Sequence, residues 1–179
     1  MITRRQLLEG IAASLAVCCV GPRAALALGG PAPELDAPAP SFNLDGVPGP
    51  RSLGDFGGRW LVLYFYPRDF TEGCTIEARG FQRDLDQFHR AGAEVVGISA
   101  DSADSHAEFC GSEALAYPLL SDPGGAVSRL YGSWMAPYSL RHTFLIDPDG
   151  ILRQSWVGVR PLGHSQEVLA ALRTLQLKS

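Results

Sequence analysis

The chain has 179 residues, of which 46% are apolar and 19% are charged, and its formal net charge is −4. These values are typical of one globular domain with an ordinary hydrophobic core, together with a leader or tail. Because the sequence contains no run of Lys or Arg and no basic helical pattern, it gives no indication of a nucleic-acid-binding surface.

Residues 1–28 resemble a twin-arginine export signal. Residues 3–8 (TRRQLL) carry the arginine pair, the apolar stretch at 11–20 is too short for an ordinary transmembrane helix, and residues 25–27 fit a small-residue cleavage site. We therefore expect export, to the periplasm or, in a photosynthetic source, to the thylakoid lumen, with no stable membrane insertion once the signal is removed. The alternative is a basic, apolar N-terminus that anchors the protein. A lipid anchor on Cys18 or Cys19 is disfavoured because neither cysteine follows a small residue.

Signal removal would reduce the four cysteines to two, Cys74 and Cys110. An even count in an oxidising compartment allows one disulfide. Residues 29–40 (GGPAPELDAPAP) are rich in Pro and Ala, which predicts an extended, mobile linker. The folded domain is expected over residues 41–177.

The elements of this domain can be predicted in chain order. Short strands are expected at 41–44 and 51–53 around a turn at 45–49, and the continuous apolar run at 60–66 (WLVLYFY) is typical of a buried central strand. The next patterns predict a helix at 74–90 ended by Gly92, a strand at 94–99 and a helix at 102–115 capped by Ser102. A short helix is expected at 122–131, with Pro123 in its first position, followed by an apolar loop at 134–138. Strands at 143–146 and 151–156, joined by a turn at 147–150, and a closing helix at 165–176 complete the domain. Strands alternate with helices before a late antiparallel hairpin, which predicts an α/β domain whose mixed sheet is covered by helices.

Cys74 stands where the central strand pattern gives way to a helix. The unpaired N–H groups and the positive dipole end of a first helical turn both favour a thiolate there. Gly73 lets backbone approach the sulfur, and Thr71 can turn its hydroxyl into the same pocket. Such a site can hold a small anionic transition state. The alternative is a buried structural cysteine.

The motif Pro67-x-x-x-Thr71-x-x-Cys74 is that of peroxiredoxins, and residues 64–78 (YFYPRDFTEGCTIEA) resemble the Q-type subfamily, also called bacterioferritin comigratory proteins. The resemblance continues, in order, through residues 91–106, 117–123 and 141–150. It implies a thioredoxin-like fold and the reduction of hydrogen peroxide and organic hydroperoxides by a cysteine, without a metal or bound cofactor.

The resemblance also implies a role for each matching residue. Cys74 matches the peroxidatic cysteine, which becomes a sulfenic acid, and Thr71 matches the threonine that hydrogen-bonds the peroxide. Pro67 matches the proline that shields the pocket, and Arg141 the arginine that stabilises the thiolate. Glu77 matches the glutamate that holds this arginine. The alternatives are a strand-edge surface charge for Arg141 and an ordinary first-turn helix residue for Glu77.

The sequence departs from many relatives at the resolving cysteine. Many Q-type members carry it five positions after the peroxidatic one, where this chain has Arg79. Cys110 resembles the variant that uses a later helix, although it can also be read as a buried cysteine beside Phe109. The two cysteines lie on separate predicted helices, so we expect one or both helix ends to unwind before they join. His106, four residues earlier, can influence Cys110, but a half-exposed helix position is the favoured interpretation.

The favoured interpretation is a peroxidase recycled by a thioredoxin-like electron donor and, as is common among Q-type relatives, monomeric. One alternative is a one-cysteine peroxidase resolved by an external thiol. Another is an exported thiol–disulfide oxidoreductase, which would need a second thiol within residues 74–77 (CTIE). The four histidines are scattered without ligand spacing, so neither a metal site nor a copper-delivery function is expected.

Overall fold

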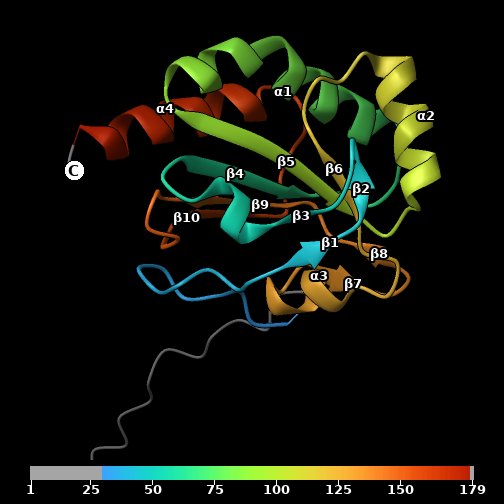
Figure 1. Ribbon diagram of the computed structural model, residues 1–179, viewed down its shortest axis with the longest axis horizontal. Coiled ribbons are helices and arrows are strands. Elements are labelled where there is room, and N and C mark those ends of the chain that lie inside the picture. Colours follow the sequence, from blue (N-terminus) through green and yellow to red (C-terminus); the bar gives the residue numbers. More distant parts are fainter. Residues whose placement is uncertain (1–29, 178–179) are drawn as a thin grey trace, which may run out of the picture.

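The computed structural model of the protein describes residues 30–177 (Figure 1). The predicted export signal at 1–28 and the first residue of the predicted linker lie outside the described residues. Within the part that is described, no helix is both long enough and apolar enough to span a bilayer.

A six-stranded mixed sheet forms the centre of the fold, in the order β10-β9-β4-β5-β6-β2. Its strands are β2 (Gly46–Val47), β4 (Trp60–Phe65), β5 (Ala93–Ser99), β6 (Leu119–Ser121), β9 (His142–Ile146) and β10 (Leu152–Val157). β4 pairs in parallel with β5 and antiparallel with β9, and the β9–β10 hairpin closes one edge. The predicted α/β class, the buried central strand and the late hairpin are therefore confirmed.

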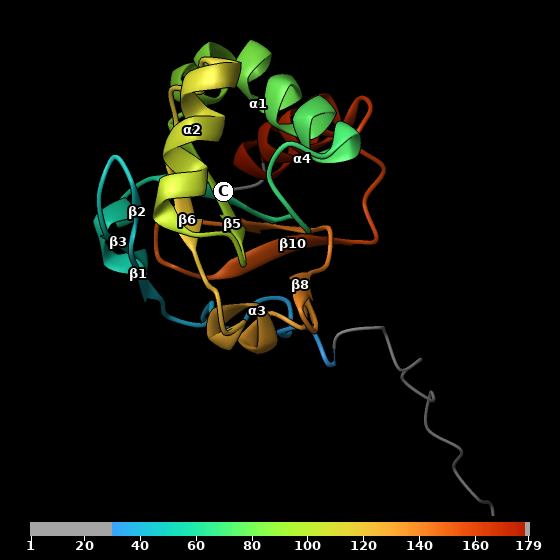
Figure 2. The ribbon, with the colours of Figure 1, turned by 90° about the vertical axis from the view of Figure 1, so that its right-hand side faces the viewer.

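Helices cover both faces of this sheet (Figures 1 and 2). α1 (Glu72–Arg90), α2 (Ala103–Glu113) and α4 (His164–Gln176) lie on one face, and α3 (Ala126–Leu130) lies on the other with the N-terminal segment. The alternation of strand side chains divides the core accordingly. In β4, Val62 and Tyr64 join the cluster under α1 and α4, whereas Leu63 and Phe65 join the cluster on the α3 side.

Two predicted boundaries need correction. α1 begins at Glu72, with Thr71 as its N-cap residue, so Cys74 is the third residue of the helix instead of the first. The short helix expected from residue 122 begins only at Ala126. The Asp122 carboxylate accepts hydrogen bonds from the backbone N–H groups of Ala126 and Ser128, so Asp122 supplies the cap and Pro123 precedes the helix.

Four short strands, each of two or three residues, escaped prediction. The expected turn at 45–49 contains β2, which pairs with β6, itself unpredicted. The expected loop at 134–138 is a hairpin of β7 (Trp134–Met135) and β8 (Tyr138–Ser139). The strands expected near 41–44 and 51–53 are present as the shorter pair β1 (Asn43–Leu44) and β3 (Arg51–Ser52), followed by the 3-10 turn Leu53–Phe56.

The expected mobile linker at 29–40 is wrong for residues 36–39. The Asp36 N–H donates to the Leu152 carbonyl at 2.8 Å, and the Ala39 N–H donates to the Gly150 carbonyl at 2.9 Å. The Asp36 carboxylate also accepts a 2.8 Å bond from Arg153. These contacts fasten the segment to the β9–β10 hairpin, so the domain includes residues that composition alone assigns to a linker.

Candidate active site

Cys74 lies in the first turn of α1, immediately after the loop that follows β4. Its side chain is buried, with 1% of the residue exposed, and the thiol is free. The N-cap residue Thr71 has the extended backbone of a helix start, and its carbonyl accepts the first helical bond, from the Thr75 N–H. The sulfur is therefore placed near the unpaired N–H groups of the helix start, as predicted.

Arg141 joins the sulfur to a buried carboxylate. Its Nη2 donates to Cys74 Sγ at 3.3 Å, and its Nη1 donates to Glu77 Oε2 at 2.5 Å. The Arg141 side chain is only 15% exposed, so it is not the strand-edge surface charge of the alternative interpretation. The Glu77 side chain is fully buried and bonded to Arg141, unlike that of an ordinary first-turn helix residue. Glu77 lies one helical turn after Cys74 and reaches the same guanidinium, which is thereby held between two groups.

Burial sets the charge balance of this pair. It raises the pKa of Glu77 to about 7, although Arg141 opposes the shift, and Glu77 Oε1 has no hydrogen-bond partner among the described residues. Burial lowers the pKa of Arg141, but the charges of Glu77 and Cys74 outweigh it and raise that pKa overall. The guanidinium therefore remains a fixed positive charge beside the sulfur.

Gly73 makes room for this guanidinium. A Cβ atom at position 73 would lie 3.2 Å from Arg141 Nη2, which is tighter than most side-chain contacts, and 3.6 Å from Pro161 Cγ, an ordinary contact distance. A larger residue would press on the charge that faces the sulfur. Gly73 thus allows Arg141, as well as backbone, to approach Cys74 closely.

Thr71 and Pro67 border the same loop. Pro67 is half-buried where the strand ends, whereas Thr71 is exposed. The Thr71 hydroxyl donates to the Arg68 carbonyl at 3.0 Å, so it is turned to its own loop and not, as expected, to the sulfur. Both residues remain within a few positions of Cys74, and the Thr71 hydroxyl is an exchangeable hydrogen-bonding group at the site.

Cys110 lies on α2 and is not joined to Cys74. Both thiols are free, and Cys110 is 9% exposed. Burial, assisted by the negative charge of Asp69, raises the pKa of the Cys110 thiol to about 11. The residue borders a cavity of about 400 Å³, together with Val47, Pro48 and Tyr117. In this conformation Cys110 is a poor nucleophile, because thiolates and not thiols react.

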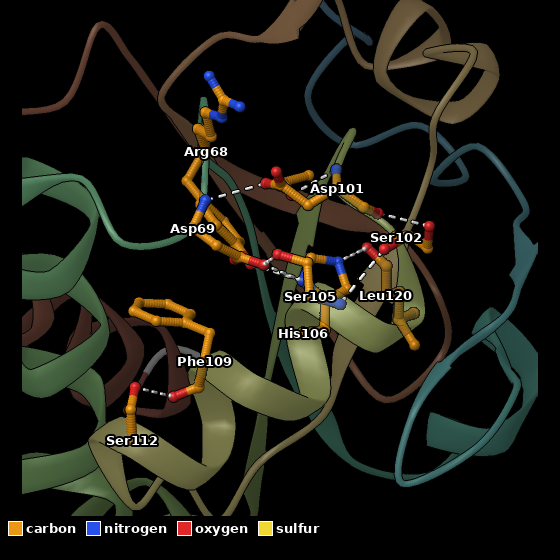
Figure 3. A network of polar contacts seen from close by, with 12 residues as sticks. Arg68, Asp69, Asp101, Ser102, Ser105, His106, Phe109, Ser112 and Leu120 are labelled. Atoms are coloured by element: carbon orange, nitrogen blue, oxygen red, sulfur yellow. Dashed lines mark hydrogen bonds and ion pairs between the residues drawn. The ribbon is translucent and has the colours of Figure 1, made fainter.

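Sequence reasoning missed a buried polar network next to the site (Figure 3). His106 is fully buried, which overturns the half-exposed interpretation, and its Nδ1 lies 2.9 Å from Asp69 Oδ2. Asp69 belongs to the loop before Cys74, and His106 precedes Cys110 by one helical turn. The only signal for this network in the sequence was a titratable residue shortly before each cysteine, Asp69 five positions before Cys74 and His106 four positions before Cys110, and only the fold brings the two together.

The other histidines give no sign of a metal centre. His142 is buried, and neither of its ring nitrogens has a hydrogen-bond partner within the described chain. His164 donates or accepts at Thr143 Oγ1, 2.8 Å away, which is a structural contact between α4 and β9. Over residues 30–177, no three His, Cys, Asp or Glu side chains gather in a way that could hold a metal ion.

Comparison with known proteins places these features in a family. A sequence model of the AhpC/TSA family matches residues 29–155. Peroxiredoxin Bcp of Xanthomonas campestris pv. campestris is 40% identical over 156 residues, which cover 78% of this chain and 94% of that protein. The mitochondrial thioredoxin-dependent peroxide reductase of Drosophila melanogaster is 39% identical over 157 residues, 80% of this chain and 67% of that protein. A solved structure of Xanthomonas campestris peroxiredoxin Q superposes with a TM-score of 0.72 at 38% identity, covering 74% of this chain and 90% of that one.

Proposed function

The chain belongs to the AhpC/TSA family, in its peroxiredoxin Q/Bcp branch, and from this membership we propose a mechanism for its individual residues. The protein has a thioredoxin-like α/β fold and is a thiol-dependent peroxidase, an oxidoreductase that acts on peroxides with a thioredoxin-type reductant. The roles of Cys74, Arg141, Glu77, Thr71, Pro67 and Cys110 are our proposal.

In the first step, the Cys74 thiolate attacks one oxygen of the peroxide. An S–O bond forms, the O–O bond breaks, and the sulfur is oxidised to a sulfenic acid while the other oxygen leaves, takes up a proton and becomes water or an alcohol. The observation that carries this proposal is the 3.3 Å contact between Arg141 Nη2 and Cys74 Sγ, with Nη1 held by Glu77. The fixed charge stabilises the thiolate and then the negative charge that develops on the reacting oxygens.

Thr71 and Pro67 would bind and shield the peroxide. We propose that the Thr71 hydroxyl exchanges its bond with the Arg68 carbonyl for one with a peroxide oxygen, since the hydroxyl is exposed and already lies at the helix start. Pro67, half-buried beside it, would limit the access of water. Neither residue forms a covalent bond to the substrate, so their role is to hold it in line with the sulfur.

In the second step, the Cys110 thiol attacks the Cys74 sulfenic sulfur. An S–S bond forms, the S–O bond breaks, and the hydroxide leaves with the thiol proton as water. Because α2 buries Cys110 and its pKa of about 11 disfavours the thiolate, this step requires a local rearrangement of α2 or of the first turn of α1. A thioredoxin-like dithiol then reduces the disulfide by exchange and is itself oxidised.

The burial and raised pKa of Cys110 also support a second candidate function, a one-cysteine peroxidase. A cysteine that stays buried with a raised pKa can also remain idle, and an external thiol would then resolve the sulfenic acid. In either case, a single chain supplies Cys74, Arg141, Glu77 and Cys110, which supports the proposal that the enzyme acts as a monomer.

Thiol mapping by mass spectrometry tests the assignment. The purified mature chain is treated with one equivalent of hydrogen peroxide, as wild type, as Cys110→Ser and as Cys74→Ser. We expect a Cys74–Cys110 disulfide in the wild type, sulfenic or over-oxidised Cys74 in Cys110→Ser, and no oxidation of Cys110 alone in Cys74→Ser. A free Cys110 beside a sulfenic Cys74 in the wild type would instead establish the one-cysteine cycle.

We also propose that the enzyme works outside the cytoplasm, in the periplasm or in a thylakoid lumen. The support is the twin-arginine pattern at residues 3–8, the short apolar stretch after it and the small residues at 25–27. In such a compartment the reductant must itself be exported or must receive electrons across the membrane.

A further inference from the structure

The loop before Cys74 is tied to the helix that carries Cys110 by a buried ion pair. His106 Nδ1 on α2 lies 2.9 Å from Asp69 Oδ2 in the loop between β4 and α1. Their side chains are 0% and 1% exposed, respectively. Figure 3 shows the pair at the junction of the loop and the first half of α2. The contact therefore spans the two segments that have to separate, or change shape, if the two cysteines are to meet.

Neighbouring groups hold both members of this pair in place. Asp69 accepts hydrogen bonds from Tyr66 Oη at 2.8 Å and from Ser105 Oγ at 2.7 Å, so its carboxylate acts only as an acceptor. On the other side of the ring, His106 Nε2 lies 3.2 Å from the Leu120 carbonyl oxygen, which also can only accept. Both ring nitrogens therefore lie within hydrogen-bonding distance of an oxygen, one in the loop and one in β6, and the ring is held between these two elements.

Two further contacts hold the loop in place. The Asp69 N–H donates to Asp101 Oδ2 at 2.9 Å, and the Phe70 ring packs against Phe109 of α2 with centroids 5.1 Å apart. Phe70 is 54% exposed and has a φ of 59°, a left-handed conformation that residues other than Gly rarely adopt. The loop is thus held in an unfavourable backbone conformation by the groups around Asp69, and it would relax if those groups released it.

We propose that the Asp69–His106 ion pair is a latch that holds the Cys74 loop on α2, favouring the oxidation step and slowing the resolution step. Asp69 and His106 are in this view positioning residues. Neither is placed to contact the substrate. The inference rests on the proposed function, because it requires Cys110 to be the resolving cysteine. While the latch is closed, Cys74 stays in its helical turn beside Arg141. When it opens, the loop and α2 can adopt the geometry that a disulfide demands.

The latch has a consequence for over-oxidation. A second peroxide can convert the Cys74 sulfenic acid to a sulfinic acid whenever resolution is slow. A closed latch prolongs the lifetime of the sulfenic acid, so it raises the sensitivity of the enzyme to excess peroxide. If the pair had a purely structural role, its loss would not separate the two steps, because general destabilisation impairs sulfenic-acid formation and disulfide formation together.

The test is the variant His106→Asn in the mature chain. Sulfenic-acid formation and disulfide formation are timed separately by rapid quenching and mass spectrometry, and the peroxide dose that half-converts Cys74 to sulfinic acid is measured. We expect disulfide formation to accelerate roughly tenfold, because hydrogen bonds to charged groups stabilise a closed form by about one to two decades in its equilibrium constant. The half-conversion dose should rise by the same factor, while sulfenic-acid formation becomes no faster.

His89→Asn provides the matched control, since His89 is exposed at the far end of α1 and lies 3.6 Å from Glu94. It should leave both steps unchanged. Ser105→Ala removes one bond to Asp69 but keeps the ion pair, so it should change resolution in the same direction by a smaller factor. If His106→Asn does not fold, Ser105→Ala and Tyr66→Phe, which removes the other hydroxyl bond to Asp69, decide the question.

Resolution as slow as or slower than in the wild type, in a folded latch variant, would overturn the latch. So would an equal acceleration in His89→Asn. The failure of the proposed function looks different, because the wild type itself would then form no Cys74–Cys110 disulfide. A wild type that forms the disulfide, with latch variants that do not alter its rate, would refute the latch alone.

Discussion

Arg141 should control the reactivity of Cys74 through its charge. At the observed 3.3 Å between Nη2 and Sγ, the attraction between a guanidinium and a thiolate is about 5 kcal/mol for an effective dielectric constant of about 20. The Glu77 carboxylate, bonded to the same guanidinium, and the partial exposure of Arg141 both weaken this attraction. If about half of this attraction remains, removing the charge raises the activation free energy by about 2–3 kcal/mol, which corresponds to a rate loss of about 30- to 150-fold.

The variant Arg141→Met keeps most of the side-chain volume and removes the charge. The measurement is the second-order rate of sulfenic-acid formation with hydrogen peroxide near neutral pH, followed by trapping the sulfenic acid in the Cys110→Ser background. Arg141→Lys keeps a charge but loses the fork that reaches Glu77 and the sulfur together, so its rate should lie between the two. Arg90→Met, at the exposed end of α1, is the matched control.

The reasoning fails if Arg141→Met reacts within about threefold of the wild-type rate, a difference under about 1 kcal/mol. It also fails if Arg90→Met loses as much, because the effect would then belong to net charge and not to position. If high salt slows the wild type as much as Arg141→Met does, the charge acts through solvent that ions can screen and not through the buried contact with the sulfur, which also contradicts the reasoning.

Two further predictions concern Glu77 and the N-terminus. Because burial raises the pKa of Glu77 to about 7 from 4.5, the folded chain binds more protons than the unfolded chain between these values, and stability falls as pH rises through them, by about 3 kcal/mol. Denaturant titrations should show this decline in the wild type and a flatter profile in Glu77→Gln, and parallel profiles would contradict it. For the export signal, replacing Arg4 and Arg5 by Lys in the full chain should retain the protein in the cytoplasm, as measured by cell fractionation. The same change at Arg23, which lies outside the pattern, should leave export intact. Equal export of both variants would rule out the twin-arginine route.

Much of the fold could be predicted because its signals are local. The run at 60–66 is continuous and apolar because β4 is buried on both faces, and the closing helix shows the spacing of a helix that covers a sheet. The turn at 147–150 predicts the hairpin because it consists of the turn-forming residues Asp, Pro and Gly. Cys74 was found in the same way, since the thiol and its helix start are adjacent in sequence.

The missed features are those that depend on distant partners. β2 is a strand only because β6 lies beside it, and residues 36–39 are ordered only because they bond to the β9–β10 hairpin. The role of Asp69 depends on a partner 37 positions away. His106 illustrates the physical reason, since a histidine on a weakly amphipathic helix carries no local sign of a buried carboxylate opposite it.

The two ends of α2 are held by contacts of unequal strength. The first half is fastened by the fully buried Asp69–His106 pair, whereas the last turn is fastened by Glu113, which bonds Arg79 on α1. The Arg79 side chain is 67% exposed, and such surface ion pairs contribute at most about 1 kcal/mol. Ala114 ends the helix in a left-handed conformation with a φ of 51°, which is unfavourable for Ala.

It follows that α2 should loosen from its C-terminal end, where Cys110 begins the last turn. Arg79 stands at the position where the resemblance to Q-type peroxiredoxins led us to look for a resolving cysteine, and its side chain restrains the helix that carries Cys110, the proposed resolving cysteine. Fraying of residues 110–114 would expose the thiol, relieve the burial that raises its pKa and leave the latch to limit how far the loop before Cys74 can follow. The resolution rate would then depend on two openings in series, a weak one at Arg79–Glu113 and a strong one at Asp69–His106, and the stronger contact should dominate the barrier.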